Sequence, residues 1–228
     1  MHISDACREF LSGVRDELPI LIGVIPFGMI YGVLALGAGL SPGEAQAMSA
    51  IVFAGSAQFM MVQLAGIGAP AIVTILTGFV INLRHALYSG SIAPHMRRLN
   101  LKWKVMLSYL LTDEAYAVAI THYQREGDVT NKHWYFLGAG LALWTSWQAS
   151  TAVGVILGTQ VPAGWQLDFA LPLTFIALVV PALKNRAGIL AAIAAGFISV
   201  LAAGLPYKLG LLSAALVGIL VGLWIKKK

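Results

Sequence analysis

Three long stretches without a charged side chain constrain this sequence more than any other feature. They run from Leu18 to Gly43, from Ala45 to Leu83 and from Trp134 to Leu167. About 20 apolar residues cross the hydrocarbon core of a bilayer, so each stretch is long enough for one or two crossings. Only 11% of the 228 residues are charged and 58% are hydrophobic, which leaves too little charge to cover a soluble domain. The sequence therefore predicts an integral membrane protein.

Charges, glycines and prolines divide the chain into eight candidate spans. They lie near residues 18–40, 46–65, 69–91, 104–122, 134–157, 169–184, 187–204 and 208–225. Lipid cannot bond to backbone amides, so we predict an all-α, polytopic membrane protein with about seven or eight transmembrane helices. The expected organisation is a short cytoplasmic segment at 1–17, one transmembrane domain at 18–225 and a basic tail at 226–228. No cleaved signal peptide is expected, because the first apolar stretch is too long for one.

Basic residues in short loops set the expected orientation. The net charge of +5 is accounted for by the positive-inside rule, without a nucleic-acid partner. With eight crossings and an internal N-terminus, nine Lys and Arg residues fall inside and five outside, which favours both termini in the cytoplasm. The segment from Arg97 to Lys104 violates the rule. A re-entrant segment at 46–65 would explain the violation and leave seven crossings.

The first span has a proline and several glycines near its centre. Proline inside a helix removes a backbone hydrogen bond and bends the helix, and many secondary transporters build binding sites from broken helices. The alternative is that Gly28 and Gly32 form a small-residue packing face, and Gly154 with Gly158 another. The candidate substrate-binding residues in this span are Pro26, Phe27, Gly28 and Tyr31.

A later segment echoes the prolines of the first span. Leu171–Pro181 begins with Leu-Pro and ends with a further proline, as Leu18–Pro26 does. With eight crossings these two spans run in opposite directions, which an inverted repeat requires. We therefore expect broken helices and consider an inverted repeat, with chance similarity as the alternative.

Asp113 and Glu114 lie near the middle of the span 104–122. A carboxylate at that depth costs at least a few kcal/mol unless it faces a cavity or a partner. Adjacent helix residues point about 100° apart, so the two carboxylates have different neighbours. We expect them to couple transport to protons, and a structural ion pair is the alternative.

Asn82, Arg84 and His85 are the polar residues of the span 69–91. Arg84 is expected to neutralise one of the two carboxylates or to hold a substrate carboxylate with its planar guanidinium. Snorkelling to the headgroups, about 10 Å away, is the alternative. His85 titrates near physiological pH and is a candidate proton relay, or else simply bonds a carbonyl.

The segment Phe53–Phe59 combines small residues with a hydroxyl and an amide. Small residues let a backbone approach a ligand, and the side chains of Ser56 and Gln58 can bond a polar group. Gly55, Ser56 and Gln58 are therefore candidate substrate-binding residues, and close helix packing is the alternative reading.

Signatures of enzymes and of metal sites are absent. The sequence contains no nucleophile elbow, no His-Glu-x-x-His motif and no phosphate-binding loop. Cys7 is the only cysteine, which excludes an intrachain disulfide and a thiolate cluster. We expect no enzyme, no cofactor and no metal.

Taken in order, four motifs of this chain resemble the AzlC family of bacterial branched-chain amino acid exporters, over essentially the whole length. They are Pro26–Gly28 with Tyr31–Gly32, Phe53–Phe59, Asn82–His85 and Thr112–Glu114. The resemblance implies export of valine, leucine, isoleucine and, less strongly, methionine across the bacterial inner membrane, driven by an ion gradient. It also implies a partner, a small AzlD-like membrane subunit.

Two other classes of function fit the composition. A passive channel for a small solute would need no titrating residue, and a scaffold subunit would carry no flux. The small residues of the last span offer a surface for a partner helix, although a second copy of the chain could use it too; they are Ser213, Ala214, Ala215, Gly218 and Gly222.

Overall fold

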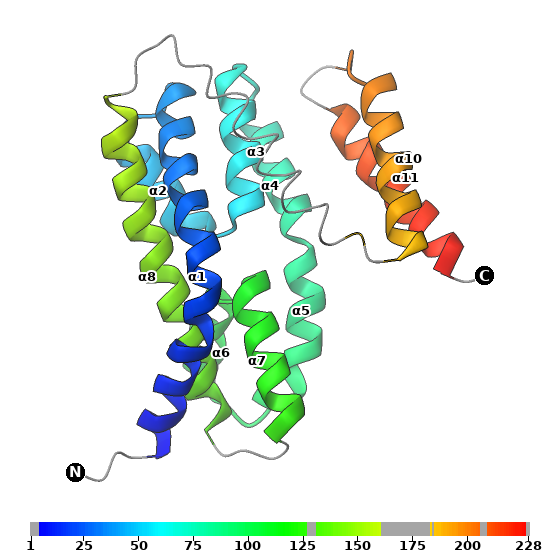
Figure 1. Ribbon diagram of the computed structural model, residues 1–228. Coiled ribbons are helices and arrows are strands. Elements are labelled where there is room, and N and C mark those ends of the chain that lie inside the picture. Colours follow the sequence, from blue (N-terminus) through cyan, green and yellow to red (C-terminus); the bar gives the residue numbers. More distant parts are fainter. Residues whose placement is uncertain (1–4, 127–130, 161–182, 184, 206–208, 227–228) are drawn as a thin grey trace. The chain divides into compact units, whose positions relative to one another are not determined.

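The computed structural model describes residues 5–126, 131–160, 183, 185–205 and 209–226, and the regular structure in these ranges is helical throughout (Figure 1). The prediction of an all-α membrane protein is confirmed. The chain divides into two compact units. The first comprises residues 1–66 and 70–162, and the second comprises residues 67–69 and 163–228.

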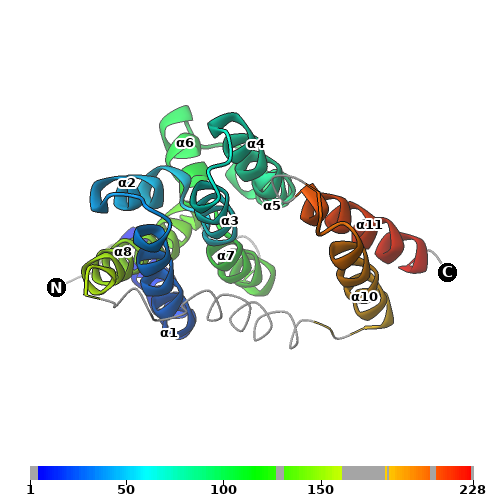
Figure 2. The ribbon, with the colours of Figure 1, turned by 90° about the horizontal axis from the view of Figure 1, so that it is seen from above.

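Two long helices form the frame of the first unit. Helices α1 (Asp5–Gly37) and α8 (Lys132–Gly158) run parallel and lie side by side in both ribbon views (Figures 1 and 2). Gly13 meets the Tyr135 backbone near the start of both helices, and Gly32 meets that of Thr151 further along. A Cβ on Gly32 would lie 2.5 Å from the Thr151 carbonyl oxygen. Gly28 and Gly32 therefore form a small-residue packing face.

Helix α1 is continuous through Pro19 and Pro26. Helices are interrupted elsewhere in this fold, but α1 is not broken at Pro26, where the sequence predicted a break. A proline costs the helix one backbone hydrogen bond, while packing against α8 extends over the whole length of α1 and keeps the helix intact. The helix begins at Asp5, so most of the segment 1–17 is continuous with the first span. Whether that segment lies outside the bilayer stays a prediction.

The segment 46–65 is re-entrant. Helix α2 (Pro42–Val52) runs inward from the end of α1, and α3 (Gly55–Gly66) returns to that same end, where a Cβ on Gly66 would lie 3.3 Å from the Ala38 side chain (Figure 1). We call this end the upper end, as drawn in Figure 1, and the end where α1 begins the lower end. The chain reverses at Phe53, whose φ of 33° lies in the left-handed region.

A capping box starts this hairpin at the upper end. The Ser41 hydroxyl accepts from the backbone N–H of Glu44 at 3.3 Å, and the Glu44 carboxylate accepts from the Ser41 backbone N–H at 2.8 Å. Hydrogen bonds from the Ser41 hydroxyl, and then from its backbone, lower the pKa of Glu44. The charged side chain is thereby held at the start of a helix, where a negative charge is favourable.

The segment 104–122 is also re-entrant, from the opposite end. Helix α6 (Leu101–Tyr109) begins at the lower end with an Asn100 cap on the Trp103 N–H, and α7 (Asp113–Glu126) returns there. The Tyr123 hydroxyl donates to the Lys132 carbonyl at 2.6 Å and ties the end of α7 to the start of α8. The sequence pattern did not indicate this second hairpin, because its two helices together have the length of one crossing.

One crossing separates the two hairpins. It consists of α4 (Ala71–Asn82), α5 (Arg84–Ile92) and the 3₁₀ helix η1 (Ala93–Met96), interrupted at Leu83. Residues 71–96 together, like α1, are long and apolar enough to cross a membrane. The crossing runs from the upper to the lower end, antiparallel to α1 and α8 (Figure 1).

Helices α10 (Arg186–Leu201) and α11 (Leu209–Lys226) form the described part of the second unit. A Cβ on Gly218 would lie 3.0 Å from the Ala195 side chain, and one on Gly222 would lie 3.3 Å from Ala191. These two glycines, which we expected to offer a surface to a partner helix, therefore pack against α10. The predicted span 169–184 and the echo at Leu171–Pro181 lie outside the described residues, apart from Leu183.

The two hairpins remove the conflict with the positive-inside rule. Because both ends of a re-entrant hairpin lie on one side, the segment from Arg97 to Lys104 shares the lower end with the start of α1. Of the described residues in the first unit, the Lys and Arg side chains other than Arg84 fall in the lower part; they are Arg8, Arg15, Arg97, Arg98, Lys102, Lys104, Arg125 and Lys132. The lower end is thus the expected cytoplasmic end.

The first unit contains an inverted repeat with an interval of 57 positions. Tyr31 on α1 contacts Phe59 on α3, with ring centroids 6.1 Å apart. Tyr88 on α5 stacks on Tyr116 of α7, with centroids 4.7 Å apart. The intervals 88 − 31 and 116 − 59 are both 57, and the first pair lies toward the upper end while the second lies toward the lower end.

Two further features keep the same interval. Ala38 meets Gly66 at the upper end, and His95 meets Tyr123 at the lower end, with ring centroids 5.0 Å apart. Phe53 caps the end of α2, and Leu110 caps the end of α6. A crossing followed by a hairpin thus occurs twice in opposite orientations, at a place other than the echo in the sequence had suggested.

Single-cysteine labelling tests the two hairpins. In a Cys7→Ser background, a membrane-impermeant maleimide should label Ala65→Cys in intact cells, because the upper end is the expected outward-facing end. The same reagent should label Lys102→Cys only in inverted vesicles. Eight full crossings would produce the opposite pattern at both positions.

Alanine substitution at α1 glycines tests the frame. We expect Gly32→Ala to destabilise the protein by about 1–3 kcal/mol, because its methyl group would overlap the α8 backbone. Gly23→Ala, with no atom within 4 Å of its new Cβ, should be neutral or stabilising by up to about 1 kcal/mol. Thermal unfolding in detergent measures both, and equal effects of the two changes would argue against direct backbone contact.

Candidate functional site

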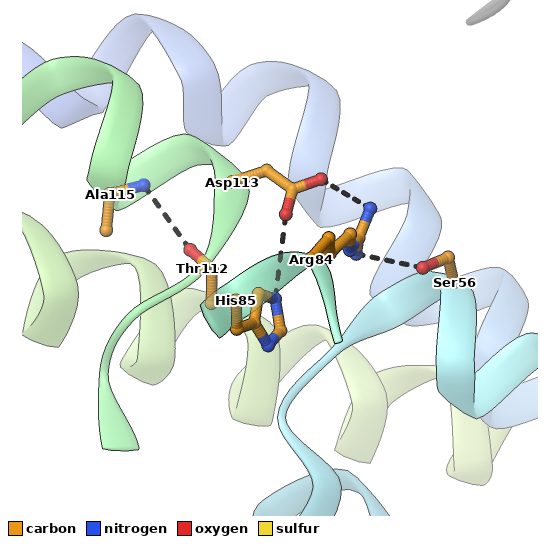
Figure 3. A network of polar contacts seen from close by, with 6 residues as sticks. All are labelled: Ser56, Arg84, His85, Thr112, Asp113 and Ala115. Atoms are coloured by element: carbon orange, nitrogen blue, oxygen red, sulfur yellow. Dashed lines mark hydrogen bonds and ion pairs between the residues drawn. The ribbon is translucent and has the colours of Figure 1, made fainter. Parts of the chain in front are cut away.

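Three half-helices begin near one another in the middle of the first unit. Ser56, Arg84 and Asp113 occupy the first turns of α3, α5 and α7, and their side chains meet (Figure 3). The first turn of a helix presents backbone N–H groups without helical partners and carries a partial positive charge. The site therefore suits a polar or negatively charged group.

Arg84 links the three half-helices. Its Nη1 lies 2.6 Å from Oδ2 of Asp113, and its Nη2 donates a hydrogen bond of 2.9 Å to the Ser56 hydroxyl (Figure 3). Of the two carboxylates considered as its partner, Asp113 is the one that pairs with it. The guanidinium is bonded within the protein and does not snorkel.

Asp113 is held from several sides. The His85 Nε2 lies 3.6 Å from its Oδ1. The Thr112 hydroxyl accepts a bond of 3.3 Å from the Ala115 backbone N–H, which caps the start of α7 and orients this turn (Figure 3). The side chains of Arg84 and Asp113 are 33% and 37% exposed, so the pair is accessible enough to exchange partners.

Glu114 has different surroundings from Asp113, as the angle between adjacent helix residues predicts. Its carboxyl group bonds within the first turn of α7, to its own backbone N–H and to the Thr112 hydroxyl. It also interacts electrostatically with Glu17 of α1. The two neighbouring carboxylates therefore have different main partners.

Aromatic rings form an apolar wall beside the ion pair. Phe59, one turn along α3 from Ser56, contacts Phe27 and Tyr31 with centroid distances of 6.3 and 6.1 Å. Tyr31 also stacks on Trp147 of α8. Gly55 lets the Trp147 ring approach, because a Cβ there would lie 3.1 Å from it.

Several predicted site residues make contacts within the protein. The Gln58 amide donates to the Ser49 carbonyl at 3.1 Å and holds the end of α2, and the Tyr31 hydroxyl donates to the Ala45 carbonyl at 2.8 Å. Gly28 packs against α8, and Pro26 lies on an exposed face of α1. Their substrate-binding role stays a prediction.

Asn82 ends α4, two residues before Arg84. Its Oδ1 is buried and accepts no hydrogen bond from the part of the chain that the structure describes. A buried polar atom without a bond is costly, so this oxygen is available to a ligand that reaches the interruption at Leu83.

Sequence reasoning missed a second set of titratable residues toward the lower end. Glu9 and Glu17 lie on the buried face of α1, and His122 Nε2 lies 3.4 Å from Oε2 of Glu9. Because Glu9, Gly13 and Glu17 recur every four positions, their common face was visible in the sequence. The prediction that residues 1–17 lie outside the first span gave no reason to expect a buried carboxyl group on this face.

A cavity of about 390 Å³ lies in the lower part of the first unit. Its walls come from α5, η1, α6 and α8, with two basic side chains among them; they include Ser89, Met96, Arg97, Lys104, Leu111 and Phe136. In the described ranges, no three His, Cys, Asp or Glu side chains gather as a metal site.

The AzlC protein family model matches residues 19–161, which is more than half of the chain. The chain belongs to the AzlC family. The matched region covers nearly all of α1–α8 and therefore the whole Arg84 network. Helices α10 and α11 lie beyond it.

Several AzlC-like relatives are membrane proteins. An uncharacterized membrane protein of Archaeoglobus fulgidus is 30% identical over 98% of this chain and 99% of its own length. The inner membrane protein YgaZ of Escherichia coli is 28% identical over 78% of this chain and 74% of its own length. The branched-chain amino acid transport protein AzlC of Bacillus subtilis is 28% identical over 78% of this chain and 69% of its own length. No solved structure matches the chain.

A double-mutant cycle tests the ion pair. Arg84→Gln and Asp113→Asn each leave one charge unpaired, so each should lower the melting temperature of the purified protein. The double variant should recover part of the loss, with a coupling of about 1 kcal/mol, since both side chains are partly exposed. Arg84→Gln with Glu114→Gln is the matched control and should recover less. Equal recovery in both double variants would contradict the assigned pair.

Proposed function

We propose that this AzlC-family protein exports branched-chain amino acids across the bacterial inner membrane, coupled to protons. The Arg84–Asp113 pair at the meeting point of three half-helices carries the proposal. It places a cation, an anion and a hydroxyl next to an aromatic wall, and an apolar amino acid needs each of these groups.

Each part of such a substrate has a counterpart in the site. The substrate carboxylate suits the Arg84 guanidinium and the positive ends of the three half-helices. The ammonium group suits Asp113, and the branched side chain suits the wall formed by Phe27 and Phe59. A zwitterion can therefore insert between Arg84 and Asp113 without leaving a charge unpaired.

The inverted repeat supports a carrier over a channel. Two hairpins approach the middle from opposite ends, and the Tyr109 hydroxyl on α6 donates to the Ala50 carbonyl on α2 at 2.6 Å. Outward or inward displacement of one hairpin against the frame would open the site to one side at a time. The basic side chains Arg97 and Lys104 beside the lower cavity would attract the substrate carboxylate on the cytoplasmic side.

The name of the Bacillus subtilis relative, a branched-chain amino acid transport protein, supports the substrate class at 28% identity. The direction of transport and the proton coupling rest on the family resemblance and on the titratable residues near Arg84. Action with a small AzlD-like membrane subunit is the third part of the proposal. Because Gly218 and Gly222 pack against α10, this subunit would have to use another surface.

Flux measurements in proteoliposomes test the function. The purified chain, with and without a candidate AzlD-like subunit, is reconstituted and loaded with radiolabelled leucine. We expect efflux that accelerates under a proton gradient and requires the small subunit. Arg84→Lys keeps the charge but loses the planar fork, so its apparent affinity for leucine should fall.

The controls separate the alternatives. Full activity without the second subunit would refute the two-component part alone. A flux that neither saturates nor changes in Asp113→Asn would identify a passive channel. Absence of leucine flux with the subunit present would contradict the transport proposal.

A further inference from the structure

Glu17 is a fully buried carboxyl group that the Arg84 network does not use. Its exposed fraction is 0%, and neither Oε1 nor Oε2 accepts a hydrogen bond from any group in the described ranges. It lies on the buried stripe of α1 with Gly13, Leu21 and Val24. An ionised carboxylate at such a position would pay the full cost of desolvation without compensation.

The titratable groups around Glu17 do not neutralise it. From α7 it faces Glu114, which adds repulsion, and from α8 Tyr135 interacts with it. On its own helix, the neighbouring Asp16 accepts a hydrogen bond of 2.7 Å from the Tyr135 hydroxyl. Arg84, which interacts with Glu114, is engaged by Asp113. Within the described ranges, the titratable groups that face Glu17 are thus acidic or neutral.

Comparing the partners of Asp113 and Glu17 indicates which of these carboxyl groups carries a proton. Asp113 has the Arg84 guanidinium as its counterion. Glu17 has no comparable partner among the described residues. We propose that Glu17 is a proton-binding site of this transporter, protonated in the conformation described here and exchanging its proton when α7 moves relative to α1. The role in transport rests on the proposed function.

A proton fits this site better than a metal cation. Metal cations that bind carboxylates, such as Ca²⁺, require several oxygen ligands, whereas Glu17 and Glu114 supply carboxyl oxygens from only two side chains. Binding a proton needs a single oxygen and removes the charge from the buried stripe. On release, the O–H bond of Glu17 breaks, the proton passes to water and the carboxylate remains.

A route from the lower end leads toward Glu17. Glu9 lies two helical turns, about 12 Å, before Glu17 on the same face of α1. His122 of α7 faces Glu9 at 3.4 Å and stacks on the Tyr135 ring with a centroid distance of 3.8 Å. These groups connect the expected cytoplasmic end with the neighbourhood of Glu17, so we expect protons to enter or leave there.

Infrared difference spectroscopy tests protonation directly, without substrate. In lipid at neutral pH, the wild-type protein should show the C=O stretch of a protonated carboxylic acid, and Glu17→Gln should lose that component. Asp16→Asn, which changes the exposed neighbouring carboxylate, is the matched control and should retain it. An unchanged band in Glu17→Gln would overturn the proposal, whatever the transport activity.

Two transport assays then separate this proposal from the proposed function. Glu17→Gln mimics the protonated group at nearly constant shape, so it should keep leucine exchange across equal pH but lose acceleration by a proton gradient. Wild-type exchange without any proton coupling, or gradient-driven efflux by Glu17→Gln at the wild-type rate, would overturn the role of Glu17. Loss of exchange in the wild type would instead refute leucine transport and leave the spectroscopic result to stand alone.

Discussion

Direct backbone contact between α1 and α8 is the constraint on which the rest of the first unit depends. Glycines on both helices remove the side chains that would separate them, so the two helices form one rigid pair. The same pair supplies anchors for both hairpins. Ser49 of α2 bonds to Thr151 of α8 at 3.0 Å, and the Trp144 indole donates to the Tyr109 hydroxyl of α6 at 2.7 Å. The tips of the two hairpins, where the chain reverses, are thereby held midway between the upper and lower ends, where the helix starts of the site can meet.

The inverted repeat explains why the site is apolar on one side and charged on the other. Phe27 and Ser56 of the first half correspond to Arg84 and Asp113 of the second, since 84 − 27 and 113 − 56 are both 57. Equivalent positions on α1 and α3 thus provide an aromatic ring and a hydroxyl, while those on α5 and α7 provide an ion pair. The same framework thus occurs twice and carries complementary chemistry in its two halves, which suits an amphipathic solute.

The fold class, the polar segments and the re-entrant nature of 46–65 could be predicted from the sequence, because charge-free runs and the positive-inside rule act on composition. The second hairpin could not, since Leu110–Thr112 has neither the glycine nor the proline that normally marks a reversal. At Pro26 the sequence predicted a break that is absent, because tertiary packing against α8 keeps the helix continuous. The partnership of Arg84 with Asp113 rather than Glu114 depended on the rotation of α7, which no local pattern specifies.

Under the proposed function, the arrangement of charges also accounts for movement of the carrier both loaded and empty. Without substrate, Arg84 and Asp113 neutralise each other, so the site carries no unpaired charge when the hairpins move. With a zwitterion inserted, each group exchanges one partner for another and the sum of charge is unchanged. Substrate movement by itself is therefore electrically silent within the site. Under the proposed function, coupling to an ion gradient then requires a separate group whose charge does change, and Glu17, a buried carboxyl that interacts with Glu114 of α7, meets that requirement.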